Sequence, residues 1–238
     1  MEILKGIEIK GKALWLNKEK ILIIADLHLG YEEALVSDGV LIPKGGMFSE
    51  MKKEILELLE LKPKLVVING DLKHEFASIS RQEWKETLEL IDLIIKQSKI
   101  ILIKGNHDNI LGPIAEKRNI EVKNFLILGD ICVLHGDKIL LECLDKKIKT
   151  LIIGHEHPAI SLTDNVKQEK YKCFLLGKYQ KKNLVVMPSF FNLIEGTDML
   201  CENLLSPFLK NQKLGNFRVF IVGDKVYDFG KLKQLKEI

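Results

Sequence analysis

The sequence lacks the hydrophobic segments that would indicate a membrane or a secreted protein. No apolar run in its 238 residues reaches the roughly 18 residues needed to span a bilayer. The stretch from Met1 to Trp15 does not show the charged-then-apolar pattern of a signal peptide. We therefore expect a cytoplasmic protein that makes no contact with membranes.

The sequence is also poor in charge of one sign and in paired cysteines. Its 36 basic and 33 acidic residues leave a net charge of only +3, which excludes the global field of a strongly basic nucleic-acid binder. No C-x-x-C pair suggests structural zinc or redox chemistry. We expect the cysteines to be small buried filler. They are Cys132, Cys143, Cys173 and Cys201.

No internal repeat, low-complexity tract or Pro/Gly/Ser-rich linker divides the chain. A hydrophobic content of 46% is ample for a buried core. The sequence therefore predicts one domain over residues 1–238.

Short β-prone runs recur along the chain and predict buried strands. They are 21–25, 65–68, 100–103, 131–134, 151–153, 184–187 and 217–222. Helical periodicity lies between some of them, over 47–59 and 84–95, and Ser80 with Glu83 predicts a capping box for the second helix. Strands and helices alternate to about residue 120, which predicts parallel strands, and strands dominate afterwards, which predicts an antiparallel or mixed second sheet. The fold class is therefore mixed α/β, with two packed sheets flanked by helices. The polar stretch 178–182 predicts a hairpin tip.

All six histidines fall in five short motifs, each placed directly after a predicted strand. The motifs are Asp26-Leu27-His28, Gly70-Asp71-Leu72-Lys73-His74, Gly105-Asn106-His107-Asp108, His135-Gly136 and Gly154-His155-Glu156-His157. Ligands of α/β sheets bind outside the carboxyl ends of the strands, so we expect the motifs to converge in one crevice. Imidazole, carboxylate and amide donors without thiolate suit manganese, iron or zinc. The adjoining glycines predict sharp turns or a close backbone approach.

These motifs, in this order over residues 20–160, resemble the D-x-H, G-D, G-N-H-[DE], H and G-H-x-H pattern of the calcineurin-like metallophosphoesterases. The resemblance implies a four-layer sandwich and a centre of two divalent ions, with manganese expected and iron or zinc as alternatives. It implies phosphodiester hydrolysis by a hydroxide that bridges the ions. Asp71 would bridge both ions. The first ion would be held by Asp26, His28, Asp71 and His157, and the second by Asp71, Asn106, His135 and His155.

Three further motif residues are candidates for contact with the substrate. The resemblance implies that His107 acts as the general acid or donates to a phosphate oxygen, and that Asp108 orients its ring. Asp108 could equally cap a helix beginning at Asn109. His74 would contact the scissile phosphate, with a polar loop residue as its alternative. Asn106 would face the substrate as well as the second ion.

The segment Gly70-Asp71-Leu72-Lys73-His74 resembles G-D-L-x-H of the nuclease subunits of double-strand-break repair complexes. Asp26 to Gly30, together with Pro188-Ser189-Phe190, resembles the compact prokaryotic ICC-like phosphoesterases associated with DNA helicase and ligase genes. The resemblance therefore implies a nuclease acting on DNA, with a helicase or ligase as a potential partner. Self-association is a further expectation.

Two other functions stay open from the sequence. One is a phosphatase or phosphodiesterase for a small nucleotide or cyclic nucleotide, since the metal chemistry is shared. The other is a non-catalytic interaction module on the same fold. Charged residues near the motifs could hold further phosphates but are expected to be ordinary surface charges. They are Lys44, Lys73, Lys104 and Arg81. Glu156 and Asp137 are expected to be solvated loop residues.

Overall fold

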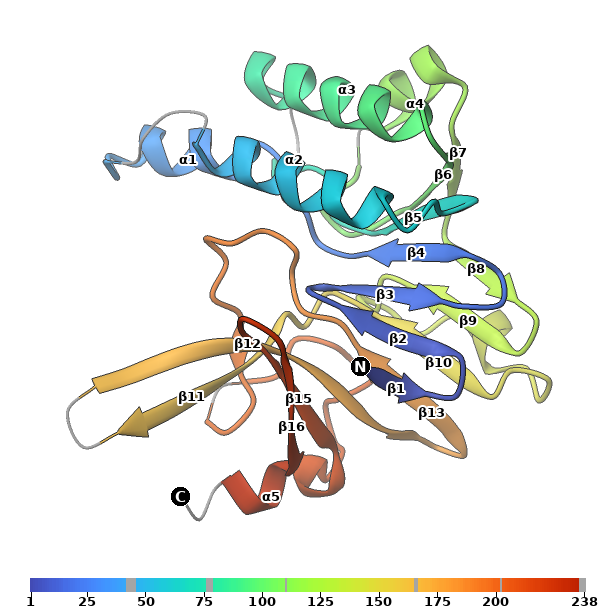
Figure 1. The fold of residues 1–238 in the computed structure, drawn as a ribbon, viewed down its shortest axis with the longest axis vertical. Helices are drawn as coiled ribbons and strands as arrows, with labels where there is room; N and C mark the ends of the chain where they lie inside the picture. The colour runs from blue at the N-terminus through green and yellow to red at the C-terminus, as the bar shows by residue number, and fades with distance from the viewer. Residues whose placement is uncertain (42–45, 76–78, 110, 165–166, 202, 236–238) are drawn as a thin grey trace.

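The computed structural model describes residues 1–41, 46–75, 79–109, 111–164, 167–201 and 203–235, and the strands form two packed sheets (Figure 1). Lys44 lies outside the described residues. Among the described helices, none is both long and apolar enough to cross a membrane.

The first sheet has seven strands in sequence order. They are β1 Glu2–Leu4, β2 Ile7–Lys10, β3 Ala13–Leu16, β4 Ile21–Ile24, β5 Leu65–Asn69, β6 Lys99–Ile103 and β7 Glu121–Lys123. Strands β1 to β4 pair antiparallel, and β4 to β7 pair parallel through helical crossovers, as the alternating pattern predicts. The helices of this half are α1 Tyr31–Ser37, α2 Gly46–Leu59, α3 Arg81–Ile95 and α4 Gly112–Arg118, and they cover one face of the sheet (Figure 1).

The second sheet has nine strands and is mixed. Its main path runs β14 Thr197–Asp198, β11 Pro158–Asp164, β12 Lys167–Tyr179, β13 Lys182–Val186, β10 Thr150–Ile153, β9 Ile131–Leu134 and β8 Phe125–Leu128. Strand β15 Arg218–Val222 pairs with β12 and with β16 Val226–Lys231. Strands β9, β10 and β13 are parallel to one another. The remaining elements are short: η1 Leu141–Leu144, η2 Leu214–Asn216 and α5 Leu232–Leu235.

Three apolar layers hold the sheets and helices together. The first two layers lie on opposite faces of the first sheet, because successive side chains of a strand point to opposite sides. In β4, Leu22 and Ile24 pack under the helices, while Ile21 and Ile23 face the second sheet. A third layer lies on the outer side of the second sheet and includes Leu232 of α5. Both packed faces of the parallel strands are therefore buried, which accounts for their continuous apolar runs.

The predicted strands and both predicted helices are confirmed within one to three residues at their ends. The N-cap is confirmed as well, since Ser80 Oγ accepts the N–H of Glu83 at 3.0 Å. The hairpin tip lies between β12 and β13 as expected. One expectation was wrong, because Cys201 is exposed while the other three cysteines are buried.

Candidate metal centre

The ends of five strands meet at one place and bring the predicted ligands together. In the first sheet, β4 is followed by Asp26 and His28, β5 by Asp71 and β6 by Asn106. In the second sheet, His135 follows β9, and His155 and His157 follow β10. The convergence expected from the sequence is therefore present, and it joins the carboxyl ends of parallel strands from both sheets.

The first group of donors contains two carboxylates and two imidazoles. Asp26, His28, Asp71 and His157 each offer one ligand atom, and these atoms lie within 4.8 Å of one another. His157 Nε2 is 3.4 Å from His28 Nε2 and 3.4 Å from Asp26 Oδ1. His28 Nε2 is 3.8 Å from Asp71 Oδ2. These are the four residues that the resemblance assigns to the first ion.

The second group shares Asp71 with the first. Asp71, His135 and His155 also bring one ligand atom each within 4.8 Å of the others. His135 Nε2 lies 3.3 Å from Asp71 Oδ2 and 2.9 Å from Asn106 Oδ1. Asp71 therefore lies between two donor groups.

The donor spacing fits a cation. Ligand atoms about 2.1 Å from a common ion lie roughly 3.0 to 3.4 Å apart, close to the separations measured here. The two facing nitrogens of His28 and His157 need a proton or a cation between them, because two lone pairs at this distance repel. The other ring nitrogen of His28, Nδ1, is buried without a hydrogen-bond partner among the described residues. The residues present therefore fit a divalent ion.

The electrostatics of the site favour unprotonated imidazoles at His28 and His155, as metal binding requires, but not at His135. Burial and the neighbouring His157 hold the pKa of His28 well below its usual range. Burial and His135 lower the pKa of His155 to about 4. Burial alone would lower the pKa of His135 too, but its hydrogen bond with Asp71 raises that pKa to about 9. Burial likewise opposes the charge of Asp71, and the hydrogen bond from His135 outweighs it and lowers the Asp71 pKa. His135 and Asp71 therefore each stabilise the charged form of the other.

Five of the seven predicted ligands have a left-handed backbone conformation. Their φ angles are 56° for Asp26, 44° for His28, 45° for Asp71, 65° for His155 and 50° for His157. Such conformations are uncommon for residues other than glycine and persist where the surroundings fix them. The loops after the strands are thus bent to turn the ligand side chains toward one another.

The predicted close approach at the motif glycines is present. A Cβ on Gly70 would collide with the ring of His135, and one on Gly105 would collide with the carboxylate of Asp71. A Cβ on Gly154 would collide with the carboxylate of Asp26. Glycine is therefore required at these positions because ligand side chains pack directly on the backbone.

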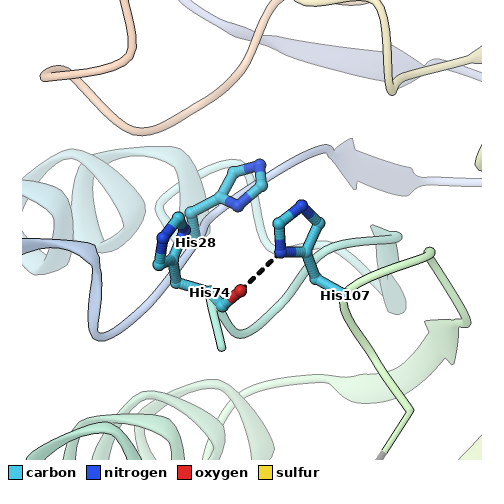
Figure 2. Close-up of side chains that lie close together, drawn as sticks. All are labelled: His28, His74 and His107. Carbon is cyan, nitrogen blue, oxygen red and sulfur yellow. Dashed lines mark hydrogen bonds between the residues drawn. The ribbon is translucent and has the colours of Figure 1, made fainter. Parts of the chain in front are cut away.

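His74 and His107 lie beside the first donor group (Figure 2). One ligand atom each of His28, His74 and His107 lies within 4.8 Å of the others. The rings of His74 and His107 stack with centroids 5.5 Å apart, and Nδ1 of His107 bonds the carbonyl of His74. His107 Nε2 is 3.9 Å from Asp71 Oδ2. Burial, and next the neighbouring His107, lower the pKa of His74. The structure therefore brings both residues next to the first donor group.

Asp108 braces the loops of the site. Its carboxylate is 1% exposed and accepts the backbone N–H groups of Leu72 and Gly105 at 3.1 and 3.0 Å. Burial and the charge of Asp71 raise the pKa of Asp108 to about 6. The alternative of a helix N-cap was wrong, because α4 begins at Gly112. The carbonyl of His74 bonds the His107 ring, whereas the Asp108 carboxylate bonds backbone N–H groups, and a role of Asp108 in orienting that ring stays a prediction.

Two charged residues near the motifs are buried, against expectation. Lys73 is 0% exposed, so it is neither a surface charge nor accessible to a phosphate. Glu156 is also 0% exposed, and its carboxylate accepts backbone N–H groups from residues 205 and 206. Asp137 is half-buried, Lys104 is half-buried and Arg81 is exposed.

Ser189 has a role that the sequence did not reveal. Its Oγ donates to the carbonyl of Asp26 at 2.9 Å, and the N–H of Phe190 bonds the carbonyl of Ala25 at 2.9 Å. The sequence motif Pro188-Ser189-Phe190 includes this serine, but the motif alone does not indicate a contact with the Asp26 loop. That contact forms only when the two sheets pack together.

Comparisons with known proteins agree with the site. The sequence profile of the calcineurin-like phosphoesterases matches residues 19–185. No curated protein matches the chain. Among solved structures, the chain is similar to the nuclease MPE of Pseudomonas putida, with 18% identity, 92% of each chain covered and a TM-score of 0.66. It is also similar to YfcE, a phosphoesterase from E. coli, with 12% identity, 89% of this chain and 97% of that chain covered and a TM-score of 0.42. The chain belongs to the calcineurin-like phosphoesterase family and is a metal-dependent hydrolase of phosphoric esters.

Proposed function

We propose that the protein is a dinuclear metal-dependent phosphodiesterase that cleaves DNA. The observation that carries this proposal is the pair of donor groups that share Asp71. Asp26, His28, Asp71 and His157 would hold one ion, and Asp71 with Asn106, His135 and His155 would hold the other. The mixed nitrogen and oxygen donor set supports manganese as the metal.

The ions, when bound, would lower the pKa of a water molecule and stabilise negative charge on the phosphate oxygens. The residues around them provide the remaining functions. Asp71 places its carboxylate between the two groups, and His28 and His157 would supply nitrogen donors. Asn106 faces the second group beside His135.

His107 is suited to protonate the leaving oxygen. Because a carbonyl only accepts, Nδ1 of His107 carries the hydrogen of its bond to His74. The nitrogen left to exchange a proton is Nε2, which lies on the Asp71 side of the ring. The His74 carbonyl therefore fixes both the tautomer and the direction of the donor.

The basic residues support a diester rather than a monoester or polyphosphate. Arginine is the usual clamp for phosphate groups with two or more charges. The chain has three arginines, and two of them pair with carboxylates in other parts of the fold. Arg118 pairs with Asp92, Arg218 pairs with Asp228, and Arg81 lines a groove beside α3. The singly charged phosphate of a diester suits a site whose non-ligand donors are His74 and His107.

DNA as the substrate is supported by two observations. The similar fold of Pseudomonas putida nuclease MPE belongs to a protein named as a nuclease. His74, the residue of the G-D-L-x-H motif, lies within the histidine cluster at the site. A helicase or ligase partner, self-association and a cytoplasmic location stay predictions.

The test uses apo-protein reloaded with Mn²⁺ and five substrates: bis-p-nitrophenyl phosphate, single-stranded DNA, nicked DNA, RNA and a cyclic nucleotide. We expect cleavage of the aryl diester and of at least one DNA substrate. Cleavage of the aryl diester with all nucleic acids left intact would refute the nuclease, and turnover of the cyclic nucleotide would then support the small-nucleotide alternative. Protein that binds two Mn²⁺ but cleaves none of the five would refute the whole proposal.

His74→Ala tests the subclass assignment. We expect this variant to retain both ions and to lose turnover on DNA. Undiminished turnover would show that His74 is only a polar loop residue.

A further inference from the structure

Glu156 lies between two ligands that belong to different ions, His155 and His157. Its carboxylate is fully buried and accepts the N–H of Leu205 at 2.9 Å and the N–H of Ser206 at 2.7 Å. A buried carboxylate with several donors holds its backbone firmly, because losing the donors would leave an uncompensated charge.

The same C-terminal stretch reaches the loop that carries His135. Ser206 Oγ donates to the carbonyl of Gly136 at 2.8 Å, one residue after that ligand. Residues 197 to 206 lie beyond the region matched by the family profile, which ends at residue 185. The contact therefore joins the family's metal motifs to a part of the chain outside them.

The backbone around Glu156 needs such support. His155 and His157 both adopt left-handed conformations, with φ of 65° and 50°. Residues other than glycine rarely adopt this conformation, and they retain it only where neighbouring contacts fix it. The N–H of His155 is fixed by Asp26, and the carbonyl of His157 accepts the N–H of Thr197 at 2.9 Å. Glu156 supplies the side-chain anchor between these two backbone bonds.

We infer that Glu156 and Ser206 form a clamp that positions His135, His155 and His157 for the two metal ions. Both are positioning residues, since neither supplies a ligand atom to the donor groups. This inference rests on the proposed dinuclear site. Glu156 acts on both ions because it adjoins a ligand of each, whereas Ser206 acts on the second ion through the His135 loop.

The experiment measures Mn²⁺ affinity by calorimetry on apo-protein, with thermal unfolding and circular dichroism as measures of folding. We expect Glu156→Ala to weaken both binding steps by about 10–100-fold, the usual effect of removing a residue that orients a metal ligand. Glu156→Gln should lose less, because its amide oxygen still accepts the N–H of Ser206. Ser206→Ala should weaken one binding step and leave the other unchanged.

Glu86→Ala is the matched control. Glu86 is a buried carboxylate on α3 that accepts a hydrogen bond from Gln82 of the same helix. We expect this variant to lower thermal stability with unchanged Mn²⁺ affinity. A general loss of stability is thereby separated from misplacement of the ligands.

A folded Glu156→Ala protein with wild-type affinity for both ions would overturn the clamp. If Glu156→Ala fails to fold, the Mn²⁺ affinities of Glu156→Gln and Ser206→Ala become the test. Wild-type affinity for both ions in both of these variants would also overturn the clamp. Wild-type protein that binds no Mn²⁺ would instead refute the proposed dinuclear site.

Discussion

Replacing Gly105 with alanine tests how tightly the bridging carboxylate is placed. A Cβ at this position would overlap the Oδ1 and the backbone nitrogen of Asp71. Gly105 is not among the residues with positive φ, so the backbone itself accepts alanine. The effect of Gly105→Ala therefore comes from the added methyl group pressing on Asp71.

The expected loss follows from the displacement. Restoring ordinary contact requires Asp71 to move by about 1 Å, and a misplacement of that size costs roughly 100-fold in turnover, or about 2.7 kcal/mol of transition-state stabilisation. Because Asp71 belongs to both donor groups, both Mn²⁺ affinities should fall as well. Overpacking should lower the free energy of unfolding by about 1–3 kcal/mol.

The assay combines calorimetric Mn²⁺ titration with hydrolysis of bis-p-nitrophenyl phosphate. Gly112→Ala is the control, since a Cβ there has open space around it and lies in helix α4. It should leave metal affinity and turnover unchanged. If folded Gly105→Ala bound Mn²⁺ and turned over like wild type, the placement of Asp71 would not limit the centre, and the reasoning would be refuted.

Three other changes give distinct outcomes. Asp71→Asn should weaken both Mn²⁺ binding steps and abolish hydrolysis of every ester, and calorimetry showing two unperturbed sites would contradict its bridging position. His107→Ala should retain both ions and lose about 10²–10⁴-fold in turnover on alkyl diesters. Turnover of activated aryl diesters should be spared, because their leaving group needs no proton. Equal losses on both kinds of substrate would exclude His107 as the general acid. Burial and the charge of Lys12 lower the pKa of Lys172 to about 7, so the unfolded chain holds this proton up to a higher pH than the folded protein does. Above pH about 7, the free energy of unfolding of the apo-protein should therefore rise with pH more steeply in wild type than in Lys172→Met. Chemical denaturation at several pH values measures this difference, and parallel curves for the two proteins would contradict it.

The sequence predicts the centre of the fold better than its edges. Buried parallel strands such as β4 and β5 are continuous apolar runs, so the sequence predicts them. Because the motif residues directly follow these runs, the sequence also predicts that the motifs converge. Strand β2 has only four residues, with half-buried charges at Glu8 and Lys10, and gives no such signal. Strand β12 carries several lysines and is stabilised by pairing with β11, β13 and β15 rather than by its own composition.

Within the site, the residues of the donor groups stand in motifs that the sequence shows, whereas the residues that hold the loops in place have no such signal. In the sequence, the residues next to Glu156 are those of an ordinary polar loop, which predicts a solvated side chain. Its hydrogen-bond donors lie about 50 residues farther along the chain. Lys73 and Asp108 likewise become buried only when separate loops pack together. Local patterns report on strands and motifs, whereas the partners of buried charges are set by tertiary packing.

The division of the ligands between the two sheets has a consequence for synthesis of the chain. Asp26, His28, Asp71 and Asn106 all leave the ribosome before the second sheet exists, whereas His135, His155 and His157 follow later. The second donor group is complete only after residue 155 has emerged and the first only after residue 157, and both need β9 and β10 to pack against β4 and β5. The nascent first sheet therefore carries aspartates and a histidine without a full site, and tight metal uptake becomes a late marker that the two halves have joined.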